Sequence, residues 1–387
     1  MSAKAQCVNV HRVACSGPGD LSGVQALIDS AELCAADIVA VMGKTEGNGC
    51  VNDFTRDFAA TSWCHFLSSH LGCTPAAVAQ RVALVMSGGT EGVLSPHFTV
   101  FSRRWVEPGS AAPSALPGQP RLVIGIAHTR DFLPEEIGRR AQIDATAAAL
   151  RQAMQQAGID DAAQVHFVQV KCPLLTTAKI HAAVQRAALP VTHDSYESMG
   201  YSRGASALGV ALGLGEISFR ADLAAAVLND WSLYSARASC SAGVELEGNV
   251  VVVLGEVVGA VSPHRIAHTV MRDAIDAASV RHLLQQAFAL DDTRSAAAWP
   301  RLVNVLAKAE ASPDGRVRTQ RHTMLNDSDI NATRHARAAV GGVLASIAGS
   351  TALYVSGGAE HQGPPGGGPV AVIVQVEPAR PAQRAAS

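Results

Sequence analysis

The stretch Asp37-Ile-Val-Ala-Val-Met-Gly-Lys44 is an apolar run that ends in a lysine. Two more runs of this kind follow, Val165-His-Phe-Val-Gln-Val-Lys171 and Arg301-Leu-Val-Asn-Val-Leu-Ala-Lys308, so the three lysines are 127 and 137 residues apart. A short apolar run bounded in this way is typical of a buried strand. A helical stretch precedes each run, at residues 21–34, 135–156 and 272–288. Recurrence at this spacing predicts three similar strand-containing units.

A hydroxyl residue followed by arginine comes after each lysine and opens a helix rich in small residues. The pairs are Thr55-Arg56, Ser202-Arg203 and Thr333-Arg334. The hydroxyl residue is predicted to cap the helix. The arginine then lies in the first turn, where the helix dipole disfavours a cation. An arginine placed there three times indicates a polar ligand rather than helix stability.

A Ser-[Gly/Ala]-Gly-x-Glu motif follows each of these helices. It begins with Ser87-Gly88, Ser241-Ala242 and Ser356-Gly357, and a strand is expected after each, at 98–102, 249–254 and 369–375. A single motif of this composition is most simply a turn, and a single strand-end lysine is most simply a surface residue. The same order of elements three times favours function, although a triplication in which one copy is active stays open.

The repeat divides the chain of 387 residues into three predicted α/β units, at residues 1–105, 113–258 and 264–379. Residues 103–120 are predicted to form a Pro/Gly/Ser-rich linker, and a second junction is expected at 259–264. The tail beyond residue 377 is expected to fray. The fold class that follows is α/β, with three similar units that can close around a pseudo-threefold axis.

The composition excludes several classes of protein. The hydrophobic fraction of 48% excludes a disordered chain, and no apolar run reaches the roughly 18 residues that span a bilayer. A net charge of −2 gives no general attraction to nucleic acid or to a membrane. Eight cysteines without a CxxC pair, in a chain with no signal-peptide pattern, favour reduced thiols and a cytoplasmic protein. Only five of the 31 basic residues are lysines, which suggests that some lysines are kept for their chemistry.

Three units around an axis would bring their equivalent residues together at the centre. Arginine supplies fixed donors for carbonyl or oxyanion oxygens, and the N–H groups of a Ser-Gly turn can form an oxyanion hole. A serine beside a neutral lysine is a nucleophile–base pair, and burial favours the neutral lysine. The predicted chemistry is therefore acyl transfer on a small, carbonyl-rich substrate, with no nucleotide or other organic cofactor.

Four other motifs are interpreted as structural. Met42-Gly-Lys-Thr45 lacks the earlier glycine of a phosphate-binding loop. Gly209–Gly215 is expected to be a site of helix packing. His264 and His268, four residues apart, are expected on a helix surface or at a cap, because no zinc-protease glutamate accompanies them. Cys240 has no cysteine counterpart in the other copies, which disfavours a thiol nucleophile.

These residues resemble one family. Gly-Lys44-Thr-Glu-Gly-Asn-Gly, Met-Ser87-Gly-Gly-Thr-Glu-Gly, Tyr-Ser-Arg203-Gly and Val-Ser356-Gly-Gly-Ala-Glu-His-Gln-Gly-Pro are similar to the cyanuric acid hydrolase/barbiturase family of ring-opening amidohydrolases, over about residues 5–377. The resemblance implies three α/β units around a pseudo-threefold axis, hydrolytic opening of a cyclic amide, and a homotetramer.

The resemblance also implies roles for individual residues. The second unit would carry the catalysis, with Lys171 as base, Ser241 as nucleophile, and Lys44 and Lys308 in support. The substrate-binding residues would be Arg56, Ser87, Gly88, Arg203, Ser241, Ala242, Ser356, Gly357 and a third arginine, for which repeat alignment favours Arg334 and helix geometry also allows Arg337.

A hard cation is a further possibility in the third copy. Glu310 lies two residues after Lys308, and the Gly/Pro-rich loop at 359–369 would expose carbonyl oxygens, which suit Mg²⁺ or Ca²⁺. A rigid loop without an ion is equally open on the residues alone. The family resemblance implies a structural Mg²⁺-type ion held by Glu310, Ala359, Gln362, Gly363, Pro364 and Gly367.

Cyanuric acid is the favoured substrate, because its three carbonyls match three Arg/Ser sets, whereas barbituric acid has CH₂ in place of one N–H. The products expected from cyanuric acid are carboxybiuret, then biuret and CO₂, and barbituric acid would give ureidomalonate. A non-catalytic small-molecule binding protein and a lysine Schiff-base enzyme are the alternatives from other classes.

Overall fold

The computed structural model describes residues 4–107, 118–289 and 301–376. Within these residues, three four-stranded sheets have strand orders β1-β4-β2-β3, β5-β8-β6-β7 and β9-β14-β10-β13. Each order is the same path: the first strand of a unit pairs with its last, the last with the second, and the second with the third. We call the sheets and their helices the first, second and third units. The ends of the units predicted from the sequence, at 1–3, 113–117 and 377–379, and the tail beyond 377 lie outside the described residues.

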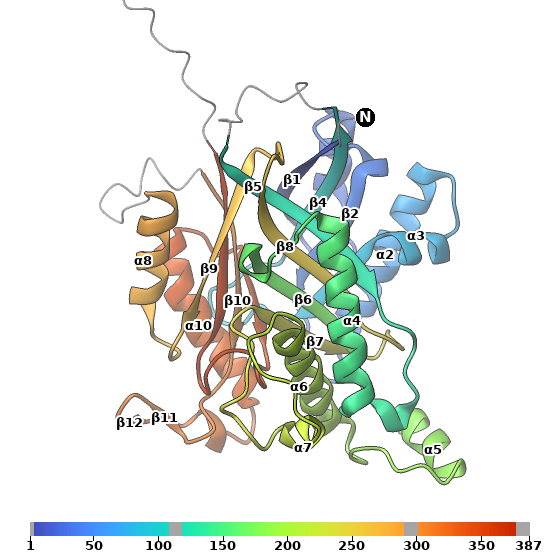
Figure 1. Cartoon of the computed structure of the whole chain (residues 1–387), viewed down its shortest axis with the longest axis vertical. Helices are drawn as coiled ribbons and strands as arrows, with labels where there is room; N and C mark the ends of the chain where they lie inside the picture. Colours follow the sequence, from blue (N-terminus) through green and yellow to red (C-terminus); the bar gives the residue numbers. More distant parts are fainter. Residues whose placement is uncertain (1–3, 108–117, 290–300, 377–387) are drawn as a thin grey trace, which may run out of the picture.

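The four sheet strands follow the chain in the same order in each unit, and the helices and a short hairpin between them differ (Figure 1). The first unit contains β1 (Ala5–Ala14), α1 (Ser22–Asp29), β2 (Ile38–Thr45), α2 (Phe54–Leu71), α3 (Pro75–Arg81), β3 (Ala83–Gly88) and β4 (His97–Val106). The second contains β5 (Pro120–His128), α4 (Arg140–Ala157), β6 (Val165–Pro173), α5 (Thr177–Gln185), α6 (Ser195–Gly213), α7 (Leu223–Ala226), β7 (Ala238–Gly243) and β8 (Val250–Val258). The third contains β9 (His264–Met271), α8 (Ala277–Phe288), β10 (Leu302–Ala309), the hairpin β11 (Arg316–Val317) and β12 (Gln320–Arg321), α10 (Ala332–Ala348), β13 (Tyr354–Gly357) and β14 (Gly368–Gln375).

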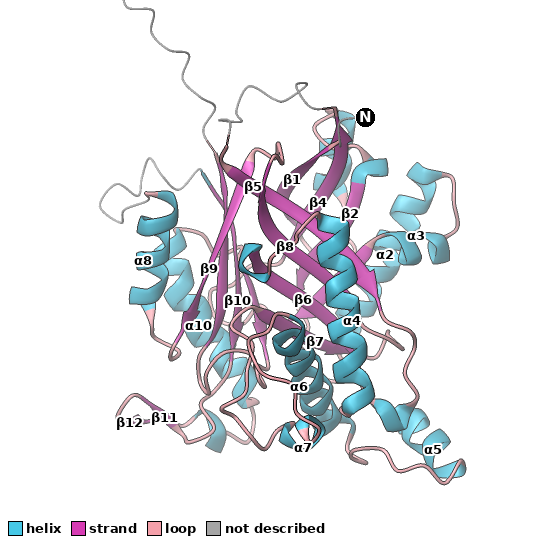
Figure 2. Cartoon of the chain, in the orientation of Figure 1, coloured by secondary structure: helices cyan, strands magenta, loops and turns pink. Residues whose placement is uncertain are grey.

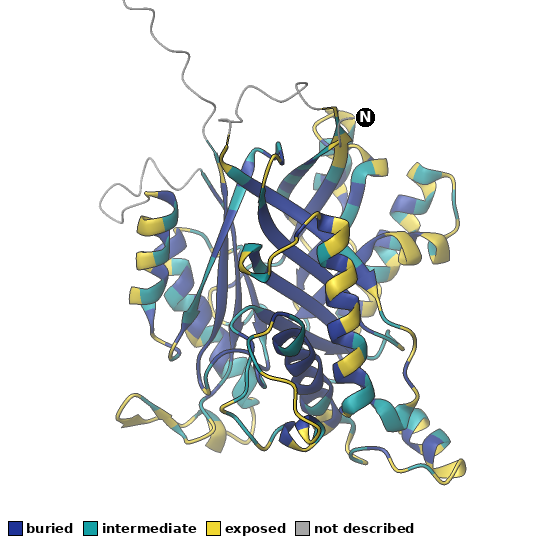
Figure 3. Cartoon of the chain, viewed as in Figure 1, coloured by how far each residue is buried: buried dark blue, intermediate teal, exposed yellow. Residues whose placement is uncertain are grey.

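The three sheets face one another at the centre of the molecule, and the helices lie outside them (Figure 2). One buried cluster takes side chains from all three sheets, among them Met42, Phe167 and Leu306. Three further clusters fill the space between each sheet and its own helices. Both faces of every sheet are therefore covered, which explains the nearly continuous burial of the strands (Figure 3).

The pleat of the strands directs the three lysines to the centre. Side chains two residues apart point to the same face of a sheet. Met42, Leu306 and Phe167 belong to the central cluster. Lys44 lies two residues after Met42, Lys308 two after Leu306, and Lys171 four after Phe167. Each spacing is even, so each lysine points to the same face as its cluster residue. All three lysines are buried, with exposed fractions of 0–1%, so they are not surface residues.

Three local predictions were wrong. Residues 103–106 continue β4 rather than starting a linker, because they complete the ten-residue pairing with β1. His264 and His268 lie in strand β9, not on a helix. The helix caps are acidic or amide residues upstream of the predicted hydroxyls: Asp53 caps α2, Asp194 caps α6 and Asn331 caps α10, each accepting a backbone N–H bond.

Helix packing at Gly209 agrees with the prediction. Gly209 lies within α6, and a Cβ built there would come within 2.6 Å of the Ile143 carbonyl oxygen of α4. The missing side chain therefore lets α6 and α4 approach each other closely. Since α6 carries Arg203, this packing also fixes the position of one candidate site residue.

Candidate active site

Residues from all three units line one small cavity at the centre of the molecule. Its lining contains Arg56, Ser87, Gly88, Arg203, Ser241, Ala242, Arg337, Ser356 and Gly357, together with Gly49 and Met199. The first nine were predicted from the sequence as substrate-binding residues. Gly49 and Met199 were not, because neither belongs to the repeated motif.

In each unit, the pairing of two parallel strands places a lysine opposite a serine. Lys44 lies opposite Ser87, Lys171 opposite Ser241, and Lys308 opposite Ser356. The second and third strands of each unit end together at the central cavity. The lysine–serine pairs are therefore a consequence of the topology of the sheet, repeated three times.

The lysine–serine contacts are alike in the first and third units. Lys44 Nζ donates to Ser87 Oγ at 3.2 Å, and Lys308 Nζ donates to Ser356 Oγ, also at 3.2 Å. Ser87 Oγ in turn donates to Ser356 Oγ at 3.3 Å. These four side chains thus form one hydrogen-bonded chain across the boundary between the two units.

The pair in the second unit is arranged differently. Lys171 Nζ donates to the Met86 carbonyl oxygen at 2.7 Å, as Lys308 Nζ does to the Cys240 carbonyl oxygen, but its further partner is Glu245 Oε1, in an ion pair at 3.1 Å. Ser241 Oγ is buried and has no hydrogen-bond partner among the described residues. The second unit therefore presents a serine hydroxyl that no neighbouring side chain holds.

Burial lowers the pKa of all three lysines, because a charged amine is disfavoured away from water. The pKa of Lys308 falls to about 7, with Arg203 adding to the effect of burial. The pKa of Lys44 falls well below its ordinary value, and the nearby Arg337 lowers it further. The pKa of Lys171 is also lowered by burial, while the Glu245 carboxylate opposes the shift. A neutral amine is thus within reach near neutral pH.

Three buried arginines complete the lining. Arg56 is the third residue of α2, Arg203 the ninth of α6 and Arg337 the sixth of α10. The prediction of a first-turn arginine therefore fits α2 but not α6. Arg334 is 35% exposed and lines an adjoining cavity rather than the central one.

The glutamate of the repeated motif was noted in the sequence but given no role. Glu91 accepts two bonds from Arg337, at 2.6 and 2.8 Å, and Glu360 accepts two from Arg203, at 2.6 and 2.7 Å. Each of these glutamates therefore fixes an arginine from a neighbouring unit. Threefold recurrence of the glutamate was the signal that could have assigned this function.

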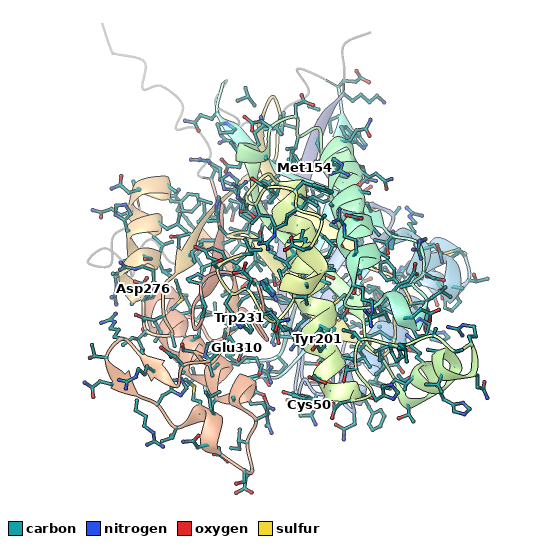
Figure 4. The ribbon with its side chains drawn as sticks, turned by 60° about the horizontal axis from the view of Figure 1, so that its bottom comes forward. Cys50, Met154, Tyr201, Trp231, Asp276 and Glu310 are labelled. Atoms are coloured by element: carbon teal, nitrogen blue, oxygen red, sulfur yellow. The ribbon has the colours of Figure 1, made fainter. Side chains whose placement is uncertain are left out.

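The residues predicted to hold a cation belong to the third unit: Glu310, labelled in Figure 4, directly follows β10, and the others lie between β13 and β14. Glu310 accepts bonds from the backbone N–H groups of Ala311 and Ala359, at 2.9 and 3.1 Å. Burial and the neighbouring Glu360 raise the pKa of Glu310 to about 7. Within residues 4–107, 118–289 and 301–376, no three His, Cys, Asp or Glu side chains form a metal-binding group.

The fold and the cavity together define an α/β protein with internal threefold pseudosymmetry and a buried site of serines, lysines and arginines. Residues 9–375 match the model of a family described as amidohydrolase ring-opening protein. The chain belongs to this family of ring-opening amidohydrolases. It is therefore a cyclic amide hydrolase, and the alternatives of a non-catalytic binding protein and a Schiff-base enzyme are not supported.

Individual relatives agree with this assignment. The chain is 58% identical to the cyanuric acid amidohydrolase of Pseudomonas sp. (strain ADP), over 95% of this chain and 99% of that protein. It is 57% identical to the enzyme of the same name from Bradyrhizobium diazoefficiens, over 95% and 98%.

The fold is also similar to solved structures. A cyanuric acid hydrolase structure superposes with a TM-score of 0.91 at 57% identity, covering 96% of this chain and all of the other. The cyanuric acid hydrolase from A. caulinodans gives a TM-score of 0.85 at 50% identity, covering 96% and 99%. The prediction of repeated α/β units is thereby confirmed. No helix among the described residues is long and apolar enough to cross a membrane.

Proposed function

We propose that this chain hydrolyses cyanuric acid and opens its ring. The observation that carries the proposal is the convergence of three serines and three arginines, one of each from every unit, on a single cavity. Cyanuric acid has three carbonyl groups related by a threefold axis, so each unit can bind one of them. The names of the relatives support the same substrate.

In the proposed mechanism Ser241 is the nucleophile and Lys171 is its base. Neutral Lys171 removes the hydroxyl proton, and the Ser241 oxygen attacks a ring carbonyl carbon. Backbone N–H groups and an arginine stabilise the oxyanion. The ring C–N bond breaks, and the proton passes to the leaving nitrogen. Water then hydrolyses the acyl-serine to give carboxybiuret, which loses CO₂ to leave biuret.

Two features of the second unit support this assignment. The Ser241 hydroxyl has no competing hydrogen bond within the described part of the chain, whereas Ser87 and Ser356 are held by lysines and by each other. Lys171 has a lowered pKa, as a general base near neutral pH requires.

The first and third units are proposed to bind the other two carbonyls. Lys44 and Lys308 orient the hydroxyls of Ser87 and Ser356 toward the substrate oxygens. We assign the third substrate arginine as Arg337, because it lines the central cavity and is 3% exposed. Arg334 is better described as a second support for Glu91, which it contacts at 3.0 Å.

The loop of the third unit fits a structural cation such as Mg²⁺. Glu310 and Glu360 are buried close together, and Arg203 and Lys308 are the cationic side chains beside them. A cation held by Glu310 and by the carbonyl oxygens of Ala359, Gln362, Gly363, Pro364 and Gly367 would add positive charge next to the two carboxylates. Its proposed contribution is to stabilise the loop that carries Glu360, and through it Arg203. No chemical step is assigned to it.

We further propose a homotetramer located in the cytoplasm. Large apolar side chains such as Phe54, Leu189 and Phe219 are 67–80% exposed and would be covered by subunit contacts. The eight cysteines are all free, which suits a reducing compartment. Light scattering coupled to gel filtration tests the tetramer.

A paired assay tests the substrate. The purified protein is given cyanuric acid and barbituric acid in separate reactions, and the ring absorbance and the products are followed. We expect biuret from cyanuric acid and little turnover of barbituric acid, because one N–H partner is missing. Ureidomalonate formation alone would transfer the assignment to barbituric acid. A folded Lys171→Arg protein with near-normal activity would refute Lys171 as the base.

A further inference from the structure

The three motif glutamates occupy equivalent places but have different partners. Glu91 and Glu360 each bind the Nε and Nη2 atoms of an arginine in a neighbouring unit. By the same threefold relation, Glu245 would bind Arg56. Instead, Glu245 Oε1 lies 3.1 Å from Lys171 Nζ.

The atoms that would make the missing pair are both unsatisfied. Among the described residues, Glu245 Oε2 and Arg56 Nε are buried atoms without a hydrogen bond. They correspond to the oxygen and nitrogen that bond in the other two pairs. Arg56 Nε has only a loose ion pair, 3.6 Å from Asp53 Oδ2. Buried charged atoms left in this way are costly.

The side chain of Arg56 is already close to the segment that carries Glu245. Its Nη1 donates to the Ala242 carbonyl oxygen at 2.7 Å, three residues before Glu245, and its Nη2 donates to the Cys50 carbonyl oxygen at 2.6 Å. Two cations therefore lie near Glu245: Lys171, at 3.1 Å, and Arg56, which is bonded to the chain three residues before it.

We propose that Glu245 is a positioning residue that alternates between Lys171 and Arg56. While it is paired with Lys171, the amine is held away from Ser241. When it pairs with Arg56, as its counterparts pair with their arginines, Lys171 is released to bond Ser241 Oγ, in the manner of Lys44 with Ser87. This inference rests on the proposed function, because it assigns Lys171 as the base for Ser241.

The exchange also changes the charge on Lys171. The groups that act on Lys171 are Glu245, Arg56 and the Cys172 thiol. A carboxylate beside Lys171 favours the protonated amine, which cannot act as a base. Its transfer to Arg56 lowers the pKa of Lys171 and frees the amine in the same movement. In this proposal the partner of Glu245 therefore decides whether Lys171 carries a proton.

A titration of Lys171 tests the contact independently of activity. The chain has only five lysines, so the side-chain resonances of lysine labelled with ¹³C at Cε can be assigned with Lys→Arg variants. We expect Glu245→Gln to lower the pKa of Lys171 by at least about one unit. The matched changes Glu91→Gln and Glu360→Gln, whose glutamates bind arginines, should leave it in place. An unchanged Lys171 titration in folded Glu245→Gln would overturn the proposal. If Glu245→Gln does not fold, Glu245→Asp provides the test. Its shorter side chain places the carboxylate farther from Lys171, so the pKa of Lys171 must still shift.

A double variant tests the exchange. In Arg56→Gln, Glu245 has only Lys171 as a partner, so kcat at saturating cyanuric acid should fall about tenfold or more. Adding Glu245→Gln should then raise kcat at least about threefold, because Lys171 is no longer paired with a carboxylate. A purely structural role predicts that the second change lowers kcat further, and that result would contradict the exchange.

The proposal and the assigned function fail in different ways. Full activity in folded Ser241→Ala and Lys171→Arg proteins would refute the assigned mechanism, whatever the lysine titration shows. Loss of activity in those two variants, with no effect of Glu245 on Lys171, would refute only the positioning role.

Discussion

The second unit differs from the first and third in a way that the shared topology does not require. In the first and third units the motif glutamate binds an arginine and the lysine binds its serine. In the second unit the glutamate binds the lysine, and Ser241 is left unbonded among the described residues. Three units with the same strand order thus hold their lysine, serine and glutamate in two different arrangements.

The backbone gives a physical reason for the difference. Gly89 has a φ of +102° and Gly358 a φ of +79°, so the chain turns two residues after both motif serines. Gly243, at the equivalent position, is the last residue of strand β7 and does not have a positive φ. The glutamate two residues later therefore leaves the strand in another direction and reaches Lys171.

The largest difference between the units should appear when their serines are removed. Ser241→Ala should lower kcat by about 10⁴-fold or more, as expected for loss of a nucleophile. Ser87→Ala and Ser356→Ala should each lower kcat/KM by roughly 10–100-fold, because each removes a single hydrogen bond to the substrate. Initial rates of cyanuric acid loss measure all three. Equal losses in the three variants would show that the units share the chemistry.

The next largest effect concerns the arginine that joins the second and third units. Arg203→Ala leaves Glu360 buried and unpaired beside Glu310, which should lower the free energy of unfolding by about 3–5 kcal/mol. Arg334→Ala is the control, because Arg337 still holds Glu91 and the removed side chain is 35% exposed. Its cost should stay below about 1 kcal/mol. Denaturant unfolding of both variants checks this, and similar midpoints would contradict it.

A pair of histidines makes the boundary between the same two units sensitive to acid. His166 Nδ1 of β6 lies 2.8 Å from His268 Nδ1 of β9. Burial lowers the pKa of His166 to about 3 and that of His268 to about 4. Since an unfolded histidine has a pKa of about 6.5, the unfolded state binds more protons between pH 6.5 and 4. Stability is therefore greatest above pH 6.5 and is lost as the pH falls.

The loss between pH 7 and pH 5 should be on the order of 4 kcal/mol from this pair, about 2 kcal/mol from each histidine. Calorimetric or denaturant unfolding at the two pH values measures it. The double change of His166 and His268 to Gln should reduce this pH dependence, and an unaltered pH profile in the double variant would rule out the pair as its source.

The smallest predicted effect is a difference in stability between alanine substitutions at two motif glycines, Gly358 and Gly243. Gly358→Ala should cost about 1–2 kcal/mol, because alanine is strained at positive φ and its Cβ would come within 2.5 Å of Arg203 Nε. Gly243→Ala meets no such strain, and its Cβ would press on the mobile end of Glu245. It should therefore cost less stability and instead alter the pH dependence of kcat. Comparison of unfolding midpoints decides the point, and a larger loss for Gly243→Ala would be the contrary result.

Much of the fold could be predicted because each repeated residue had a local signal. The apolar runs ending at Lys44, Lys171 and Lys308 indicated three buried strands, and their recurrence indicated three units. A prediction that used only the spacing of two residues failed. His268 was expected on a helix because of its four-residue spacing from His264, yet both lie in a strand whose inner positions are fixed by pairing with β14.

The sequence by itself determined the family, because the motifs are read directly from the chain. It also determined the repeated unit and the residue types that meet at the centre, because strand pleat and helix periodicity are local properties. The tertiary structure decided which atoms pair. Whether Arg334 or Arg337 lines the cavity, and whether Glu245 reaches Arg56 or Lys171, depends on where strands and helices from different units meet. Those distances are set by the packing of three sheets around one core, and no local pattern in the chain encodes them.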